Sequence, residues 1–211
     1  METSMSDGLS TETKQRLEQW ESLIVLGVKW SDRQQLTAVN NFINRLDYVS
    51  DNEQWHTVDY WATPLQTIVT KGGDCEDFAI AKYFTLVAMG MDEKKLRLTY
   101  AKTINTNTSH IVLTYFEQAN ADPLVLDNLH PRIMPAYERQ DLQPVYSFNA
   151  KGIWLEKREN RTQYLARSSR LTIWRELLNK MNVEAADETR MVCLYQYYDL
   201  DNPVAKAYCP S

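Results

Sequence analysis

The sequence predicts an α+β fold in which a buried helix packs on an antiparallel sheet. Apolar residues at helical spacing are concentrated before residue 90, whereas β-prone runs dominate after it. Short polar segments separate neighbouring β-prone runs, so each strand can pair with the next one along the chain. Helices that precede locally paired strands are typical of α+β proteins.

The length and composition indicate one folded domain. The 211 residues fit a single domain with short appendages, and the 44% share of hydrophobic residues is enough for a sizeable core. We expect a leader or tag-like disordered segment over residues 1–15, the domain over residues 16–186 and a C-terminal tail over residues 187–211.

The charge and the apolar runs exclude two kinds of partner. Lysine and arginine number 23 against 28 aspartate and glutamate residues, and a formal net charge of −5 does not favour binding to nucleic acid. The longest apolar run, Leu23 to Val28, is far shorter than the ~20 residues that span a bilayer. We therefore expect neither nucleic-acid binding nor membrane insertion.

Two amphipathic helices are expected at the start of the domain. Apolar residues recur at helical spacing over Thr11 to Leu26 and again over Gln34 to Tyr48. A turn over Trp61 to Pro64 and a short apolar run over Leu65 to Val69 follow them.

The clearest helix follows a pair of glycines. Lys71-Gly-Gly-Asp74 predicts a sharp break in the chain, because paired glycines permit positive φ and a close backbone approach. Cys75 to Met89 is apolar almost all round, as is typical of a buried helix. Asp74 and Asp77 are placed to cap its start. Cys75 therefore lies in the first turn, at the positive end of the helix dipole.

Strands are expected in the second half. Leu96 to Lys102 alternates in polarity, a polar loop follows over Thr103 to Ser109, and His110 to Phe116 and Pro123 to Asp127 are β-prone. The remaining expected elements are strands over Val145 to Phe148 and Gly152 to Leu155 and a helix over Leu171 to Met181.

A histidine and an aspartate are predicted to meet between two of these strands. If 110–116 and 121–127 pair symmetrically around a four-residue loop, His110 lies directly opposite Asp127. Their Cβ atoms would then be roughly 5 Å apart, within reach of a hydrogen bond between the side chains. A slip by one residue would put them on opposite faces of the sheet.

Cys75, His110 and Asp127 have the residue types of a nucleophilic triad. The pKa of a thiol falls at a helix N-terminus and beside an imidazolium. His110 would take the thiol proton and later give it to the leaving group, while Asp127 would orient the imidazole. The Cys75 backbone N–H would donate to an oxyanion, with Trp61 or Gln66 as candidates for a second donor. Each triad residue also has a structural interpretation, as a core cysteine, a strand histidine or an aspartate that starts a turn.

Three carboxylates surround Cys75 in the sequence. Asp74, Glu76 and Asp77 place negative charge beside the sulfur, which disfavours a thiolate. They complement the helix dipole, and they also resemble part of a calcium site, which takes six to eight oxygen ligands. A cation there would cancel the acidic field.

The stretch Lys71-Gly-Gly-Asp-Cys-Glu-Asp-Phe-Ala79, with His110 opening a strand and Leu126-Asp127, resembles the bacterial transglutaminase-like cysteine proteinases of the LapG type. The resemblance covers about residues 30–160. It implies a papain- or transglutaminase-like fold whose nucleophile-bearing helix packs on an antiparallel sheet. The resemblance also implies that Cys75 is the nucleophile, His110 the base and Asp127 the orienting acid.

The resemblance also implies a cofactor and partners. It implies calcium dependence, with Asp74, Glu76 and Asp77 as ligands. LapG-type enzymes cleave the N-terminal region of a large cell-surface adhesin and so promote biofilm dispersal. A membrane receptor of the LapD type, which senses cyclic di-GMP, sequesters the protease, and the dinucleotide binds the receptor.

Because the start of the chain lacks a secretory signal and family members are exported, we expect a periplasmic protein whose signal peptide has been removed.

Two other functions remain open from the residues. A transglutaminase-like acyltransferase or deamidase would use the same triad, because either an amine or water can attack a thioester. A non-enzymatic calcium-binding interaction module would leave Cys75 merely buried.

The chain has three cysteines, Cys75, Cys193 and Cys209. Their odd number and wide spacing argue against a disulfide framework but leave open a Cys193–Cys209 bond.

Overall fold

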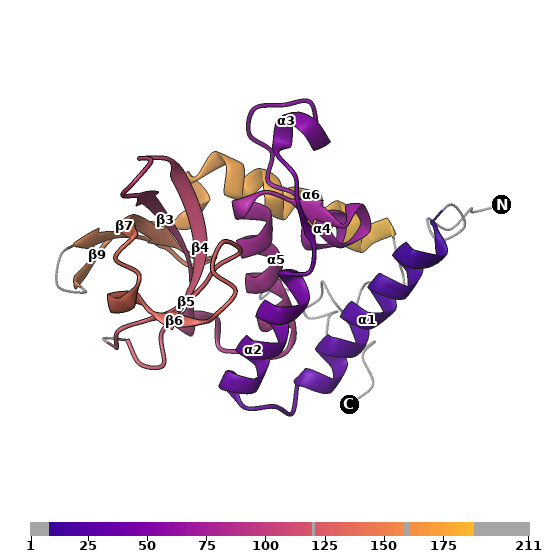
Figure 1. Cartoon of the computed structure of the whole chain (residues 1–211), viewed down its shortest axis with the longest axis horizontal. Helices are drawn as coiled ribbons and strands as arrows, with labels where there is room; N and C mark the ends of the chain where they lie inside the picture. Colours follow the sequence, from indigo (N-terminus) through magenta and orange to yellow (C-terminus); the bar gives the residue numbers. More distant parts are fainter. Residues whose placement is uncertain (1–8, 120, 158–160, 188–211) are drawn as a thin grey trace.

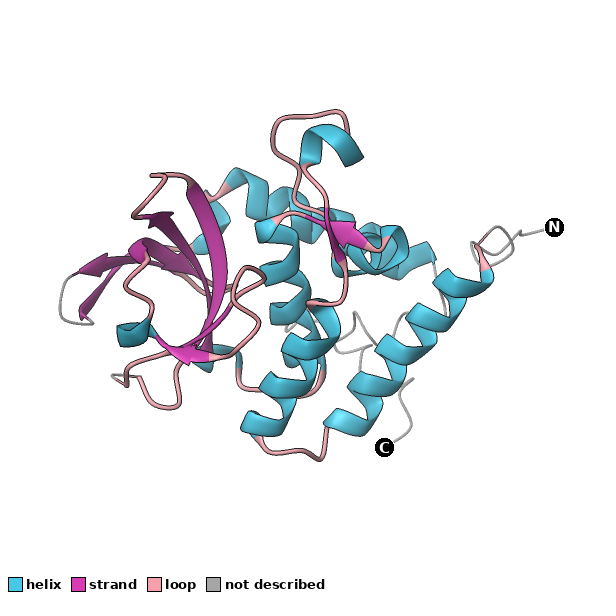
Figure 2. Ribbon diagram, viewed as in Figure 1, coloured by secondary structure: helices cyan, strands magenta, loops and turns pink. Residues whose placement is uncertain are grey.

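The computed structural model of the chain describes residues 9–119, 121–157 and 161–187. Helices gather on one side of the molecule and the large sheet on the other (Figure 1, Figure 2). The helices are α1 (Thr11–Gly27), α2 (Asp32–Ile43), α3 (Asp51–Gln54), α4 (Pro64–Thr70), α5 (Cys75–Ala88) and α6 (Thr172–Asp187), with short 3-10 helices η2 (Glu93–Lys95), η3 (Ala136–Glu138) and η4 (Ser168–Arg170).

The large sheet has seven strands in the order β6-β5-β4-β3-β7-β8-β9, and every neighbouring pair is antiparallel. The predicted α+β class is therefore confirmed. A second, two-stranded parallel sheet joins β1 to β2, the glycine pair. The strands are β1 (Asp47–Tyr48), β2 (Gly72–Gly73), β3 (Leu96–Thr103), β4 (Ser109–Tyr115), β5 (Leu124–Leu126), β6 (Met134–Pro135), β7 (Leu142–Phe148), β8 (Ile153–Lys157) and β9 (Arg161–Ala166).

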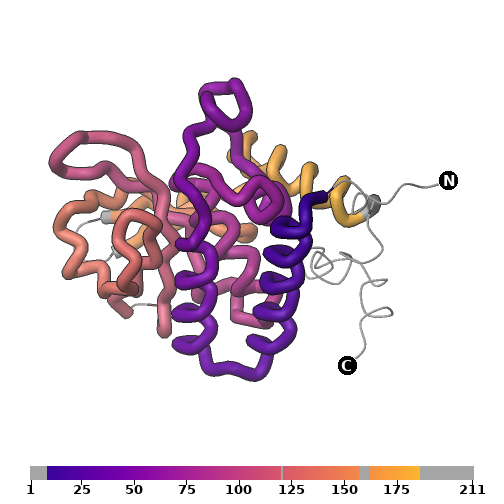
Figure 3. The backbone as a smooth tube through the Cα atoms, turned by 45° about the vertical axis from the view of Figure 1, so that its right-hand side comes forward, coloured from indigo at the N-terminus to yellow at the C-terminus, as the bar shows by residue number. Residues whose placement is uncertain are grey.

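Helix α5 is the centre of the core. It contacts α1, α2 and α4 on one side and strands β3 and β4 on the other. Ile80, Tyr83 and Leu86 have no exposed surface, as the all-round apolar pattern predicted. Trp174 of α6 stacks on Phe84 with the ring centroids 5.5 Å apart. Helices α1 and α2 lie side by side and antiparallel next to α5 (Figure 3).

The glycine pair before α5 permits close packing and not an unusual backbone conformation. A Cβ atom on Gly72 would lie 2.7 Å from the carbonyl oxygen of Asp47, and one on Gly73 would overlap the side chain of Asp77. The close approach is thus confirmed. The expected positive φ occurs instead at Lys71, where φ is 64° and α4 ends. A left-handed residue is a common way to end a helix.

The helices before the glycine pair match the predictions in part. The helix expected over Gln34 to Tyr48 ends at Ile43, because the chain then turns into β1 beside the glycines. The run Leu65 to Val69 belongs to α4, which starts at Pro64. Helix α1 begins at Thr11, where the helix over Thr11 to Leu26 was expected, and this prediction is confirmed. The domain division at residues 15 and 187 stays a prediction.

None of the helices in the described part of the chain has the length and apolar character that a membrane span requires.

Candidate active site

Cys75 is the first residue of α5, and its thiol faces strand β4. The side chain is half-buried, and the backbone N–H of Ile111 is close enough to its sulfur to lower the pKa of the thiol. The thiol itself donates to Oε2 of Glu76 over 3.0 Å. Because Ile111 directly follows His110 on β4, the structure places the sulfur beside the strand that carries the predicted base.

His110 and Asp127 are in direct contact. The distance between His110 Nε2 and Asp127 Oδ1 is 2.8 Å, and both side chains are buried. In the tautomer with the proton on Nε2, Nδ1 is an acceptor that is free of the carboxylate. A nitrogen in this state is suited to take a proton from a thiol.

The strand register that brings these residues together differs from the expected one by two positions. Leu113 pairs with Leu126 and Tyr115 with Leu124, so Asp127 lies just beyond the end of β5 and not directly opposite His110. The predicted direct opposition is therefore wrong, because the connection between the strands is longer than four residues. A shift by two keeps both side chains on the same face, since side chains alternate with a period of two.

Arg139 completes this pair, and no sequence pattern predicted its role. Its Nη2 lies 2.7 Å from Asp127 Oδ2, and its side chain is 3% exposed. Asp141 holds the guanidinium from the other side through two contacts of 2.8 Å. Asp127 also accepts the N–H of Leu129 on Oδ1. The orienting carboxylate is therefore an acceptor for three donors.

These partners keep Asp127 ionised. Burial alone would raise its pKa, but the hydrogen bond and charge of His110, the Leu129 N–H and Arg139 together lower the pKa far below its usual value. The carboxylate is therefore negative at neutral pH and can hold the imidazole ring in one orientation.

The acidic residues around Cys75 form a larger cluster than the sequence indicated. Carboxylate oxygens of Asp51, Asp74 and Asp77 lie within 4.8 Å of one another, as do those of Asp51, Asp59 and Glu76. The predicted residues Asp74, Glu76 and Asp77 are thus joined by two from α3 and the segment after it. The sequence did not indicate those two, because they are remote from Cys75 along the chain.

This cluster fits a divalent cation. Oδ1 of Asp51 and Oδ1 of Asp74 are buried and have no hydrogen-bond partner among the described residues. Burial, followed by the charges of Glu76 and Asp77, raises the pKa of Asp74 to about 9. Burial also raises the pKa of Asp77 to about 8, although its Oδ1 accepts the Ala62 N–H. Crowded oxygen donors without partners are suited to a hard cation such as calcium.

The same acids act on the thiol. Burial raises the pKa of Cys75 far above its usual value, and the charge of Glu76 and its hydrogen bond raise it further. The dipole of α5 and the Ile111 N–H act in the opposite direction. Neutralising the acidic field would therefore favour the thiolate.

The two residues suggested as second oxyanion donors make packing and capping contacts, and a part for either in an oxyanion hole stays a prediction. Trp61 is buried and stacks on Phe148 with the ring centroids 5.7 Å apart. The amide oxygen of Gln66 accepts the N–H of Thr63 in the capping box of α4. Cys193 and Cys209 lie outside the described residues.

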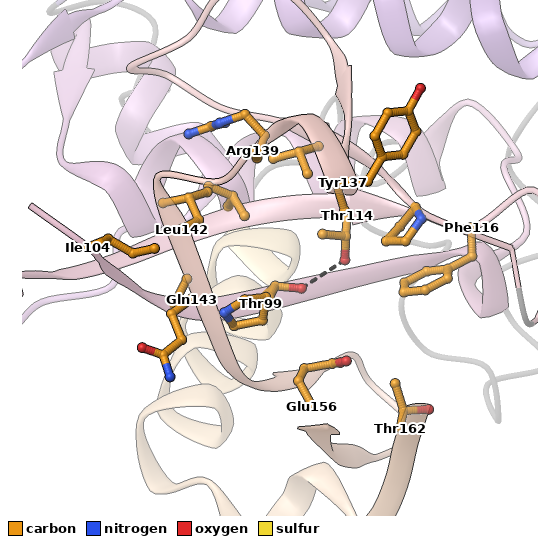
Figure 4. Close-up of a pocket in the computed structure, with 16 residues that line it drawn as sticks. Thr99, Ile104, Thr114, Phe116, Tyr137, Arg139, Leu142, Gln143, Glu156 and Thr162 are labelled. Carbon is orange, nitrogen blue, oxygen red and sulfur yellow. Dashed lines mark hydrogen bonds between the residues drawn. The ribbon is translucent and has the colours of Figure 1, made fainter. Parts of the chain in front are cut away.

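A cavity of about 570 Å³ borders the site through Arg139 (Figure 4). Thr99 and Thr114 line it, with their hydroxyl oxygens 2.8 Å apart. These residues alternate with Leu98 and Leu113 of the core, so the cavity lies on the face of the sheet away from α5.

A comparison with protein-family models identifies the family. The model of the bacterial transglutaminase-like cysteine proteinases matches residues 13–156, more than half of the chain. The chain belongs to this family. Its resemblance to LapG-type proteases and its transglutaminase-like fold are therefore confirmed, and it is a cysteine protease. This membership favours peptide hydrolysis over a non-enzymatic module.

Solved structures of LapG from Legionella pneumophila are similar to this protease over most of its length. One has 40% sequence identity and a TM-score of 0.75, covering 83% of this chain and 91% of that chain. A calcium-bound LapG has 41% identity and a TM-score of 0.74 over 84% and 95% of the two chains. An EGTA-treated LapG has 40% identity and a TM-score of 0.75 over 83% and 93%. The comparison with curated proteins gave no match.

We expect Arg139→Gln to destabilise the protease by about 3–5 kcal/mol, because it leaves the buried Asp127 carboxylate without its cationic partner. Urea unfolding at pH 7 measures this change. Arg33→Gln, at an exposed position of α2, is the control and should change the free energy of unfolding by less than about 0.5 kcal/mol. Equal stability of the two variants would show that the ion pair contributes nothing.

Proposed function

We propose that the protein is a calcium-dependent cysteine endopeptidase that cleaves the N-terminal region of a large cell-surface adhesin in the periplasm. The observation that carries the proposal is the buried pair of Asp127 with His110, on the strand whose next residue, Ile111, approaches the sulfur of Cys75 with its backbone N–H. Membership of the proteinase family supports the peptidase chemistry, and the likeness to LapG supports the adhesin substrate.

Hydrolysis would proceed in two steps. In the first, Sγ of Cys75 attacks the scissile carbonyl carbon, and its proton passes to Nδ1 of His110. The backbone N–H of Cys75, which has no partner within its helix, donates to the oxyanion. The C–N bond then breaks, and the leaving amine takes the proton from His110 to leave a thioester.

In the second step, water attacks the thioester. His110 takes a proton from the water, the C–S bond breaks, and the carboxylic acid and the free thiol are released. Asp127 keeps its charge throughout and stabilises the imidazolium that forms twice in the cycle.

Calcium would be held by carboxylates at the start of α5 and from the segment of α3. When bound it supplies positive charge that offsets the acidic field around the thiol. The residues that would supply oxygen ligands are Asp51, Asp59, Asp74, Glu76 and Asp77. The calcium-bound state of LapG supports this assignment.

Regulation is part of the same proposal. A membrane receptor of the LapD type, loaded with cyclic di-GMP on its cytoplasmic side, would sequester the protease, and its release would promote biofilm dispersal. The support is the likeness to LapG over most of both chains.

We expect the purified protease to cut an adhesin N-terminal fragment when calcium is present and to leave it intact in EGTA. Cys75→Ala should lower kcat/KM by about 10⁴-fold or more, because no other group can form the thioester. Mass spectrometry of the products detects the new N-terminus. Cleavage that persists in Cys75→Ala would disprove this nucleophile. Incorporation of an amine into a glutamine substrate without cleavage would indicate an acyltransferase instead.

We expect stability in EGTA to fall as the pH rises from about 4 to about 9. The unfolded chain releases the protons of Asp74 and Asp77 near pH 4, whereas the folded protein holds them until their pKa values of about 9 and 8. Bound calcium should remove this loss of stability. The measurement is the Tm at each pH, in EGTA and in calcium.

The variant Asp74→Asn tests the origin of this loss. It should weaken the pH dependence in EGTA and reduce the increase in Tm on adding calcium. Glu18→Gln removes the same charge from an exposed position of α1 and should behave like the unmodified protein. If Asp74→Asn keeps the full calcium effect, Asp74 is not a ligand.

A further inference from the structure

The segment of residues 60–63, between α3 and α4, lies between the acidic cluster and α6. On one side its backbone faces the acids. The N–H of Tyr60 donates to Oδ2 of Asp51 over 2.6 Å. The N–H of Ala62 donates to Oδ1 of Asp77 over 2.7 Å. Donors on every second residue are typical of an extended chain, whose successive residues point to opposite sides. The hydrolytic steps above do not use this segment.

These bonds decide which oxygen of Asp51 remains available. The residue is 4% exposed, and while Oδ2 accepts the Tyr60 N–H, Oδ1 is buried without a hydrogen-bond partner among the described residues. Oxygens of Asp51, Asp74 and Asp77 lie within 4.8 Å of one another. A buried charged oxygen is costly unless it is paired or binds a metal. The segment therefore leaves Oδ1 of Asp51 as the oxygen that a cation can bind.

Helix α6 holds the same segment from the other side. Nζ of Lys180 donates to the carbonyl oxygen of Trp61 over 2.5 Å and lies 3.6 Å from the ring centroid of Tyr60. One turn later, Oε1 of Glu184 accepts the hydroxyl of Thr63 over 2.8 Å. Residues four apart lie on the same face of a helix, so one face of α6 makes both contacts.

The core fixes α6 in place. Trp174, Leu177 and Met181 are at most 2% exposed and belong to the hydrophobic core. The contacts from α6 to residues 60–63 therefore start from an anchored helix. A chain of printed contacts thus leads from the core through α6 and this segment to the carboxylates of the acidic cluster.

We propose that Lys180 and Glu184 are positioning residues of the calcium site. They hold residues 60–63 so that the N–H groups of this segment orient Asp51 and Asp77 for the cation. The proposal rests on the calcium site assigned under the proposed function. Partners that orient metal ligands from outside commonly contribute about 10- to 100-fold to metal affinity.

Calorimetric titration of calcium into the metal-free protein at pH 7 tests this without any substrate. We expect Lys180→Met to raise the Kd for calcium by about 10-fold or more, because the bond to the Trp61 carbonyl is lost. Removal of a positive charge near carboxylates by itself favours a cation, so a higher Kd cannot come from the charge. Lys180→Arg keeps a donor and should bind calcium nearly as the unmodified protein does. Lys14→Met, at an exposed position of α1, is the matched control.

Two variants of Glu184 test the second contact at constant charge. Glu184→Gln keeps an oxygen that can accept the Thr63 hydroxyl, whereas Glu184→Leu removes it, and both lose one negative charge. We expect a higher calcium Kd for Glu184→Leu than for Glu184→Gln. If the Tm in EGTA shows that Lys180→Met does not fold, this pair decides the question.

An unchanged or lower calcium Kd in Lys180→Met would overturn the proposal, as would equal Kd values for the two Glu184 variants. A loss of affinity that Lys180→Arg does not restore would also overturn it and assign Lys180 to packing alone. If the unmodified protein binds no calcium, the calcium site of the proposed function fails together with this inference, whereas the cleavage assay tests the nucleophile separately.

Discussion

The buried carboxylate of Asp127 is the interaction on which the rest of the site depends. One oxygen contacts His110 on β4, the other contacts Arg139 beyond η3, and its backbone carbonyl accepts the amide of Asn44 at the end of α2. A carboxylate without exposed surface is costly unless such partners satisfy it. Because these partners come from separate elements, Asp127 joins the end of α2, through its backbone carbonyl, and Arg139, through its carboxylate, to the strand that carries His110.

The start of α5 combines two conflicting requirements. Carboxylates favour a helix N-terminus, and Asp74 and Asp77 form a capping box there, but the same charges disfavour the thiolate of Cys75. Burial strengthens the repulsion, since water cannot screen it. Two further carboxylates, from Asp51 and Asp59, add to the negative field. Under the proposed function, calcium resolves the conflict by stabilising the turn and the nucleophile together.

Helix α5 links the core to the chemistry. It is covered by helices on one side and by strands on the other, so most of its side chains are buried. Its first turn carries Cys75, and its middle carries the fully buried Lys82. A substitution on this helix therefore acts on the packing of the core, and variants there need a stability measurement beside each activity measurement.

The sequence by itself determined the elements whose residues interact with near neighbours. The apolar run predicted α5, Gly-Gly-Asp-Cys75 predicted a nucleophile at its start, and the face shared by His110 and Asp127 followed from strand alternation. The exact register was decided by the connection between β4 and β5, whose length the strand pattern does not encode. Only the tertiary structure placed Arg139 on the triad and brought Asp51 and Asp59 to the acidic cluster. Contacts between residues far apart in the chain leave no periodic signal, because they depend on how separate elements pack together.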